Sequence, residues 1–107
     1  DQNIAIPMYE KILEKYPNRI PIIVNKRRDS KIADIGKSKF LVQKDMVMNQ
    51  FIYVIRKRLN LKSSEAIFVT INNEMCTSGE FLSDIYDKHK NVDGFLYVTY
   101  SSENTFG

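Results

Sequence analysis

The chain has 107 residues, of which 43% are hydrophobic and 27% are charged, and these values are ordinary for one soluble globular domain. A net charge of +3 is compatible with acidic peptides, anionic lipid or nucleic acid and does not choose among them. A single cysteine excludes an internal disulfide, and no apolar run approaches the roughly 20 residues of a membrane-spanning helix.

The first predicted element is a helix that ends at Tyr16. Pro7 suits its first turn, where the missing N–H is not needed, and Pro17 disfavours helical geometry at the residue before it. One face of this helix carries the apolar side chains Met8, Ile12, Leu13 and Tyr16. This spacing predicts an amphipathic helix whose apolar face is either part of the core or the exposed wall of a groove.

Two strands follow, at Arg19–Lys26 and at Lys37–Gln43. Both are rich in β-branched or large apolar residues, and a long charged loop separates them, so a hairpin is predicted. Pro21 cannot donate a hydrogen bond to a sheet, so it belongs at the start of a strand or on an edge.

The second half of the chain begins with the clearest amphipathic helix, at Met48–Leu59, for which Asp45 is the predicted N-cap. Ile67–Asn72 is a third predicted strand. Thr77 and Glu80 have the spacing of a capping box, which predicts a short helix over the residues that follow. This helix covers Phe81–His89.

The last predicted strand starts at Phe95, and its almost continuous apolar character is typical of a strand buried on both faces in the middle of a sheet. The polar residues after it favour a flexible tail, which we place at residues 101–107. Such a tail presents the carboxylate of Gly107.

The order of the elements is helix, strand, strand, helix, strand, helix, strand. It predicts an α+β protein of the β-grasp type, with a four-stranded mixed sheet, a crossing helix and an added N-terminal helix. We expect residues 1–107 to form a single domain, in which residues 1–16 are the N-terminal helical segment.

Residues for catalysis or metal binding are scarce. His89 is the sole histidine and is placed at a helix end among lysines, and Cys76 has no base near it in sequence. One cysteine and one histidine do not make a structural zinc site, and no glycine-rich phosphate loop is present. We therefore expect no enzyme, no metal and no cofactor. The basic clusters at 26–28 and 56–58 leave a nucleic-acid-binding module as a distant alternative.

Several strings of the sequence together resemble the autophagy-related ubiquitin-like modifiers of the GABARAP and microtubule-associated-protein light-chain type. They are YPNRIPIIV (16–24), KFLV (39–42), QFIYVIRKRLNL (50–61), FVTINN (68–73) and DGFLYVTYSSENTFG (93–107). The resemblance runs from Tyr16 to Gly107 without an obvious insertion. It implies a ubiquitin-like β-grasp body.

The resemblance also implies that Gly107 is joined to the amine of phosphatidylethanolamine by a ubiquitin-like cascade. The partners implied are activating and conjugating enzymes and a processing cysteine protease, with Phe68, Thr70 and Phe106 as recognition residues. Because the sequence ends at Gly107, we expect it to be the processed form or one built to mimic that form. The implied location is the cytoplasm, and the autophagosome membrane after lipid attachment.

A second implied activity is the capture of cargo receptors through short aromatic-x-x-aliphatic motifs, which add a strand to the sheet edge. Three groups of residues are implied. The aromatic pocket comprises Ile12, Pro21, Ile23, Lys39, Leu41 and Phe95; the aliphatic pocket comprises Phe40, Val42, Met46, Phe51, Val54 and Ile55; and the cations that meet acidic flanking residues are Arg19, Lys37, Lys39 and Arg58.

The sequence departs from the family pattern at Asp1–Ile6, which lacks the usual basic extension, and at Met8, Gln43 and Thr70. Gln43 replaces a proline and thereby restores a backbone N–H at the end of a strand. The main alternative function is a ubiquitin-like interaction domain that is never conjugated.

Overall fold

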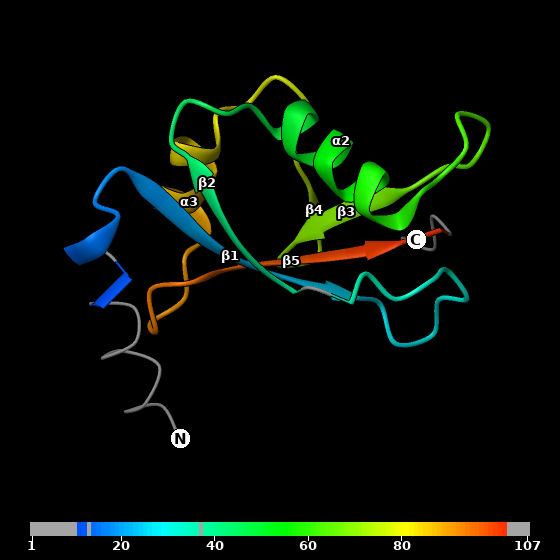
Figure 1. Cartoon of the computed structure of the whole chain (residues 1–107), viewed down its shortest axis with the longest axis horizontal. Helices are drawn as coiled ribbons and strands as arrows, with labels where there is room; N and C mark the ends of the chain where they lie inside the picture. Colours follow the sequence, from blue (N-terminus) through cyan, green and yellow to red (C-terminus); the bar gives the residue numbers. More distant parts are fainter. Residues whose placement is uncertain (1–10, 13, 37, 103–107) are drawn as a thin grey trace.

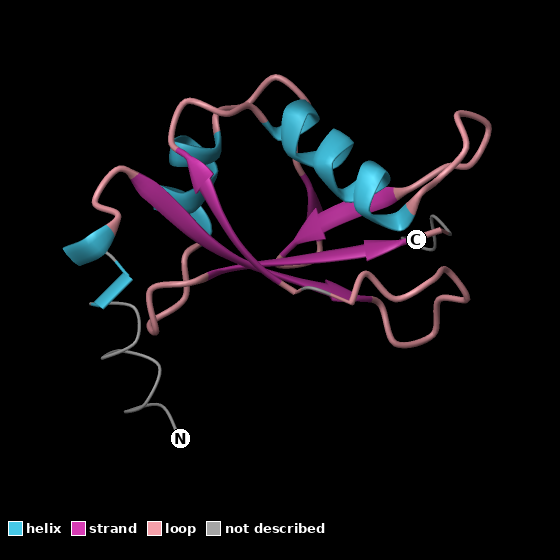
Figure 2. Cartoon of the chain, viewed as in Figure 1, coloured by secondary structure: helices cyan, strands magenta, loops and turns pink. Residues whose placement is uncertain are grey.

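The computed structural model describes residues 11–12, 14–36 and 38–102. Five strands form one sheet, and two helices cross the same face of it (Figures 1 and 2). The strands are β1 (Arg19–Lys26), β2 (Lys39–Gln43), β3 (Phe68–Ile71), β4 (Glu74–Met75) and β5 (Leu96–Ser101), and the helices are α2 (Met48–Leu59) and α3 (Leu82–His89).

The strand order is β2-β1-β5-β3-β4, with β1 and β5 parallel at the centre and the other pairs antiparallel. The α+β fold with a mixed sheet and a crossing helix is therefore confirmed. The predicted number of four strands was wrong, because β4 adds a short fifth strand after a turn at Asn72 and Asn73, both of which have positive φ.

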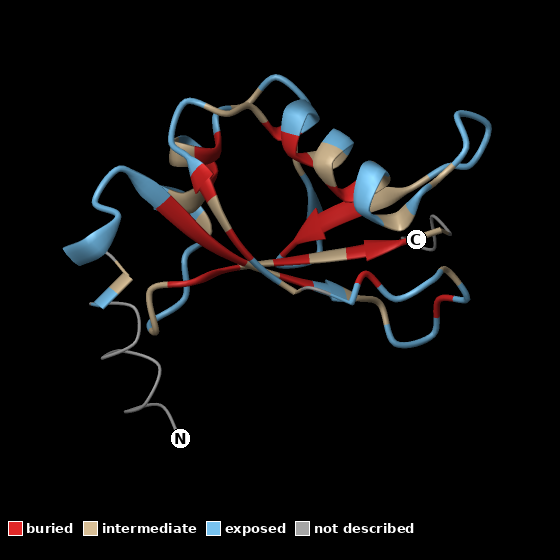
Figure 3. Ribbon diagram, viewed as in Figure 1, coloured by how far each residue is buried: buried red, intermediate tan, exposed pale blue. Residues whose placement is uncertain are grey.

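The core lies between the sheet and the two helices, and Figure 3 shows that the buried residues (red) are concentrated in the central strands and in parts of the helices. Alternate residues of the central strands point into it, as the two-residue period of a strand requires. In β5, Leu96 and Val98 are buried whereas Tyr97 and Thr99 are half-buried. The strand is central, as predicted, but it is not fully buried on both faces.

The helix α2 spans the predicted residues, but its N-cap is Val47 and not Asp45. The Val47 N–H donates to Oε1 of Gln50 at 2.9 Å, so Gln50 satisfies the backbone at this end. The predicted capping box at Thr77 is also wrong as a helix cap, because α3 begins later, at Leu82 with Phe81 as its N-cap. Thr77 and Glu80 instead close a local turn.

The end of α2 is fixed by a left-handed residue and by an arginine. Asn60 has φ of 56°, and its N–H bonds to the carbonyls of Arg56 and Lys57. The guanidinium of Arg56 then donates to the carbonyl oxygens of Glu65 and Lys62, each at 2.8 Å. Arg56 therefore holds the loop that leads to β3.

The predicted N-terminal helix is described only at residues 11–12 and 14–15, which are helical. The N–H of Tyr16 donates to the carbonyl of Ile12 at 2.7 Å, a helical bond that closes this turn. Met8, Leu13 and the segment Asp1–Ile6 lie outside the described residues.

The root of the predicted tail lies in the sheet. Ser101 is the last residue of β5 and is 2% exposed, and the N–H of Ser102 donates to Oγ of Ser30 at 3.2 Å. Nearby, the Tyr100 hydroxyl donates to the carbonyl of Ala33 at 3.0 Å. The strand therefore continues further than the predicted tail boundary, and residues 103–107 lie outside the described residues.

Candidate functional site

The strand β2 lies at the edge of the sheet and has no neighbour on its outer side within the described part of the chain. The N–H of Val24 donates to the carbonyl of Ser38 at 2.7 Å, and the same register pairs Ile22 with Phe40. Hydrogen-bonded pairs alternate along an antiparallel ladder. The backbone groups of Lys39, Leu41 and Gln43 therefore point away from β1.

This arrangement also explains the position of Pro21. Pro21 pairs with Leu41 at a position where no backbone bond joins β1 to β2. The parallel ladder with β5 starts one residue later, at Ile22 and Leu96. The missing N–H of proline therefore removes no hydrogen bond between β1 and β2. Among the described residues, no strand occupies the outer edge of β2.

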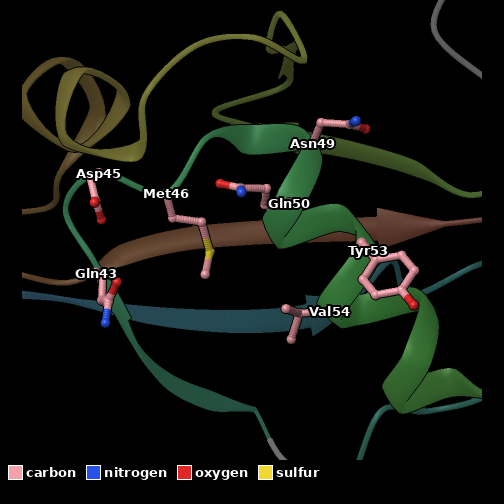
Figure 4. Close-up of a pocket in the computed structure, with 7 residues that line it drawn as sticks. All are labelled: Gln43, Asp45, Met46, Asn49, Gln50, Tyr53 and Val54. Carbon is pink, nitrogen blue, oxygen red and sulfur yellow. The ribbon is translucent and has the colours of Figure 1, made fainter.

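An open pocket of about 670 Å³ lies between the end of β2 and the outer face of α2 (Figure 4). Its apolar surface comes from Met46 and Val54, and its rim is polar. The lining residues are Gln43, Asp45, Met46, Asn49, Gln50, Tyr53 and Val54. A smaller hollow of about 270 Å³ follows the helix past Val54 to Arg58. We call these two hollows together the β2–α2 groove.

The electrostatics of the groove are set by exposed cations at the end of α2. The guanidinium carbon of Arg58 lies 5.8 Å from the ring centroid of Phe40, which brings the last turn of α2 next to the start of β2. Lys57 Nζ lies 5.7 Å from the ring centroid of Tyr53, and Lys39 is exposed. This end of the groove is therefore suited to acidic residues.

The residues assigned to the aliphatic pocket fall into two groups. Met46 and Val54 line the groove and are half-buried. The other four, Phe40, Val42, Phe51 and Ile55, are members of the core. Phe51 and Ile55 are 0% exposed, and Phe51 packs edge-on against Phe40 with the ring centroids 5.7 Å apart. All four side chains are buried in this structure, and none of them lines the groove.

Four residues assigned to the aromatic pocket, Pro21, Ile23, Lys39 and Leu41, alternate with the core residues of β1 and β2 and so point to the opposite face of the sheet. Register pairs Pro21 with Leu41 and Ile23 with Lys39. Leu41 and Ile23 are half-buried, as is Ile12 in the helical turn before β1. Phe95 is 6% exposed and does not belong to the main core cluster. The paired strands thus bring Pro21, Ile23 and Leu41 together as an apolar patch on this face.

The remaining assigned residues are more dispersed. Arg19 is exposed at the start of β1, whereas Lys37 lies outside the described residues. Phe68 is half-buried in β3, and Thr70 is 6% exposed and pairs with Thr99 and Met75. Gly107 and Phe106 also lie outside the described residues.

The groove contains residues that the sequence analysis did not assign. Gln43, Asn49, Gln50 and Tyr53 line it but carry no apolar period that marks them as contact residues. Asn49, Tyr53 and Lys57 do recur at four-residue steps. That spacing places them on one side of α2, and it could have identified them once β2 was known to be an edge strand.

The sequence profile described as "Autophagy protein Atg8 ubiquitin like" matches residues 7–107. The chain belongs to the Atg8 family. It is 50% identical to Autophagy-related protein 8e of Arabidopsis thaliana over 97 residues, which are 91% of this chain and 80% of that protein. It is 51% identical to Autophagy-related protein 8 of Schizosaccharomyces pombe over 98 residues, which are 92% of this chain and 81% of that protein.

Solved Atg8 structures have the same fold. The crystal structure of Trypanosoma brucei ATG8 matches with a TM-score of 0.91 at 40% identity, covering 100% of this chain and 92% of that one. The structure of Plasmodium falciparum Atg8 in complex with a Plasmodium falciparum Atg3 peptide matches with a TM-score of 0.90 at 30% identity, covering 99% and 94%. The family and the ubiquitin-like fold expected from the sequence are confirmed.

Atg8 proteins function as phosphatidylethanolamine-conjugated modifiers in autophagosome formation, and this homologue is a ubiquitin-like autophagy modifier and not an enzyme. Neither described helix is long and apolar enough to cross a bilayer. Within the described residues, there is no cluster of three or more histidine, cysteine or acidic side chains that could hold a metal ion.

Proposed function

We propose that Gly107 is the residue through which this Atg8 protein is joined to phosphatidylethanolamine, and that the β2–α2 groove binds partner proteins. The match to the family profile extends through Gly107, which supports the first part. The observation that carries the second part is the open groove beside an edge strand whose backbone groups point outward.

The chemistry at Gly107 belongs to partner enzymes. An activating enzyme adenylates the carboxylate with ATP and releases pyrophosphate, and an enzyme cysteine then displaces AMP to form a thioester. The lipid amine attacks the thioester, forms an amide and frees the thiol. Glycine suits this route because it has no side chain to obstruct a narrow channel. The two acyl chains then hold the protein at the autophagosome membrane.

Partner proteins add a strand to the outer edge of β2. The aliphatic side chain of an aromatic-x-x-aliphatic motif lies on Met46 and Val54, and its aromatic side chain lies on the patch around Leu41 and Ile23. Acidic residues of the partner meet Lys39 and Arg58. The partners we propose are cargo receptors and enzymes of the conjugation cascade, and the Atg3 peptide bound to Plasmodium falciparum Atg8 supports the latter class.

Leu41→Glu tests the peptide site. Leu41 is half-buried on the patch and is absent from the core cluster, so a charge there removes apolar contact without disrupting the fold. Titration calorimetry with an aromatic-x-x-aliphatic peptide should show binding to the native protein and none to this variant. The matched control, Val92→Glu, changes a side chain that is 86% exposed, and it should bind like the native protein. Equal affinity of Leu41→Glu and the native protein would place the site elsewhere.

A further inference from the structure

The two ends of the β2–α2 groove differ in charge. Because the Arg58 guanidinium lies over the Phe40 ring, the last turn of α2 and the start of β2 make one end, which carries Arg58 and Lys57. Lys39 is exposed at the same end, on the other face of β2. The other end lies where β2 passes into α2, and there the lining side chains include Gln43 and Asp45 (Figure 4).

Asp45 is the acidic member of the seven residues that line the main pocket. Its side chain is exposed, and no ion pair joins it to another residue in the described part of the chain. The neighbouring Lys44 is exposed as well but does not line the pocket. The Asp45 carboxylate thus lies at the end of the groove opposite Arg58 and Lys57, although the chain as a whole has a net charge of +3.

The backbone offers a further hydrogen-bonding group at the same end. The alternation established above directs the N–H of Gln43 away from β1, and its carbonyl accepts a bond from the Met46 N–H at 3.2 Å. A strand added in parallel takes evenly spaced, slanted bonds from alternate residues. It would use Lys39, Leu41 and then the N–H of Gln43, so the ladder continues beside the main pocket.

The direction of the added strand follows from the order of the two apolar sites. Met46 follows the end of β2 and lines the main pocket with Gln43, whereas Val54 lines both hollows. The aliphatic residue of the motif therefore lies nearer the end of β2, and the aromatic residue lies nearer its start. In an aromatic-x-x-aliphatic motif the aromatic residue comes first. The peptide therefore runs parallel to β2, and the residues after its aliphatic anchor reach Gln43 and Asp45.

This inference rests on the proposed peptide binding. We propose that the groove selects partners that carry a lysine or arginine directly after the aliphatic anchor, with the cation beside Asp45 and the N–H of Gln43 donating to the peptide backbone. The preferred partner is thus an extended peptide with an acidic flank before the aromatic residue and a basic flank after the aliphatic one.

Three fluorescein-labelled peptides test the inference by anisotropy at low salt. They share one acidic-aromatic-x-x-aliphatic core and carry two lysines, two glutamines or two glutamates after it. The native protein should bind the lysine peptide about two- to fivefold more tightly than the glutamate peptide, the range expected of exposed ion pairs. The preference should shrink as the salt concentration rises.

Asp45→Asn should abolish the preference among the three peptides, and the matched control Lys44→Gln should keep it. Gln43→Pro removes both the backbone donor and the Gln43 side chain, whereas Gln43→Ala removes the side chain and keeps the donor. Gln43→Pro should therefore bind all three peptides about two- to tenfold more weakly than Gln43→Ala does. Equal affinities of the native protein for all three peptides would overturn the inference while leaving the proposed peptide site intact. If none of the peptides binds, or if Leu41→Glu binds them unchanged, the proposed peptide site fails as well.

Discussion

Phe51 was expected to contact a bound peptide, but the structure buries it in the core, and Phe51→Ala tests this core position. The Phe51 side chain is 0% exposed and meets the ring of Phe40 edge-on at 5.7 Å between centroids. Truncation of a buried phenylalanine loses transfer free energy and leaves a cavity, which together cost about 3–5 kcal/mol. The lost aromatic pair accounts for about 0.5–1.5 kcal/mol of this. A domain of this size has about 5–15 kcal/mol in total, so the loss is a large share.

Urea unfolding followed by circular dichroism measures the effect, and Tyr53→Ala is the matched control. Tyr53 is an aromatic residue on the same helix, but it is 60% exposed, so its removal should cost less than about 1 kcal/mol. A Phe51→Ala variant that unfolds at the same urea concentration as Tyr53→Ala would refute the assignment of Phe51 to the core. Phe51 would then be a candidate for direct contact with a bound peptide.

Two further predictions concern turns that hold the sheet. The hydrogen bond that Tyr97 donates to the Asp93 carboxylate, with burial and the carboxylate charge adding to it, raises the pKa of Tyr97 to about 12. Because the folded pKa lies above the usual 10, this stabilisation is complete below pH 10 and is lost as the pH rises through about 12. In an alkaline titration followed by tyrosinate absorbance, Tyr97→Phe should lack the ionisation near pH 12 that the native protein shows. Identical titration curves of the two proteins would contradict the contact. Arg56→Ala should lower the free energy of unfolding by about 1–2 kcal/mol and speed amide hydrogen exchange in residues 60–67, because two carbonyls lose a charged donor. The exposed control Lys57→Ala should leave this exchange unchanged. Unchanged exchange in Arg56→Ala would contradict the role of Arg56.

The sequence predicted most of the fold because the apolar periods of the main elements are strong. Met48–Leu59 has an unambiguous helical period, and the strands at β1 and β5 are dense in β-branched and aromatic residues. Two of the wrong predictions concern the ends of helices, where more than one nearby residue can satisfy the free backbone groups. Asp45 is of a residue type that is favoured at N-caps, but the helix begins two residues later than that position requires, with Val47 as its N-cap. The side chain of Gln50 accepts the hydrogen bond from the Val47 N–H.

The candidate site was predictable only in part. Apolar residues such as Phe51 and Met46 look alike in sequence, and the packing of α2 on the sheet decides that the first is buried and the second lines the groove. The outward direction of the Gln43 N–H depends on the pairing register, which a single sequence does not determine. Polar rim residues such as Asn49 share the helical spacing of α2 but carry no apolar period, so they can be recognised as groove residues only once β2 is known to be an edge strand.

Conjugation in a reconstituted reaction tests the central claim most directly. The protein is incubated with activating and conjugating enzymes, ATP and phosphatidylethanolamine liposomes, and its mass is measured together with that of Gly107→Ala. We predict that the native protein gains one phosphatidylethanolamine less one water, with the lipid on the carboxyl group of Gly107, and that the variant gains nothing. An unchanged native mass, in a reaction that conjugates Autophagy-related protein 8 of Schizosaccharomyces pombe, would contradict the account, as would full conjugation of Gly107→Ala.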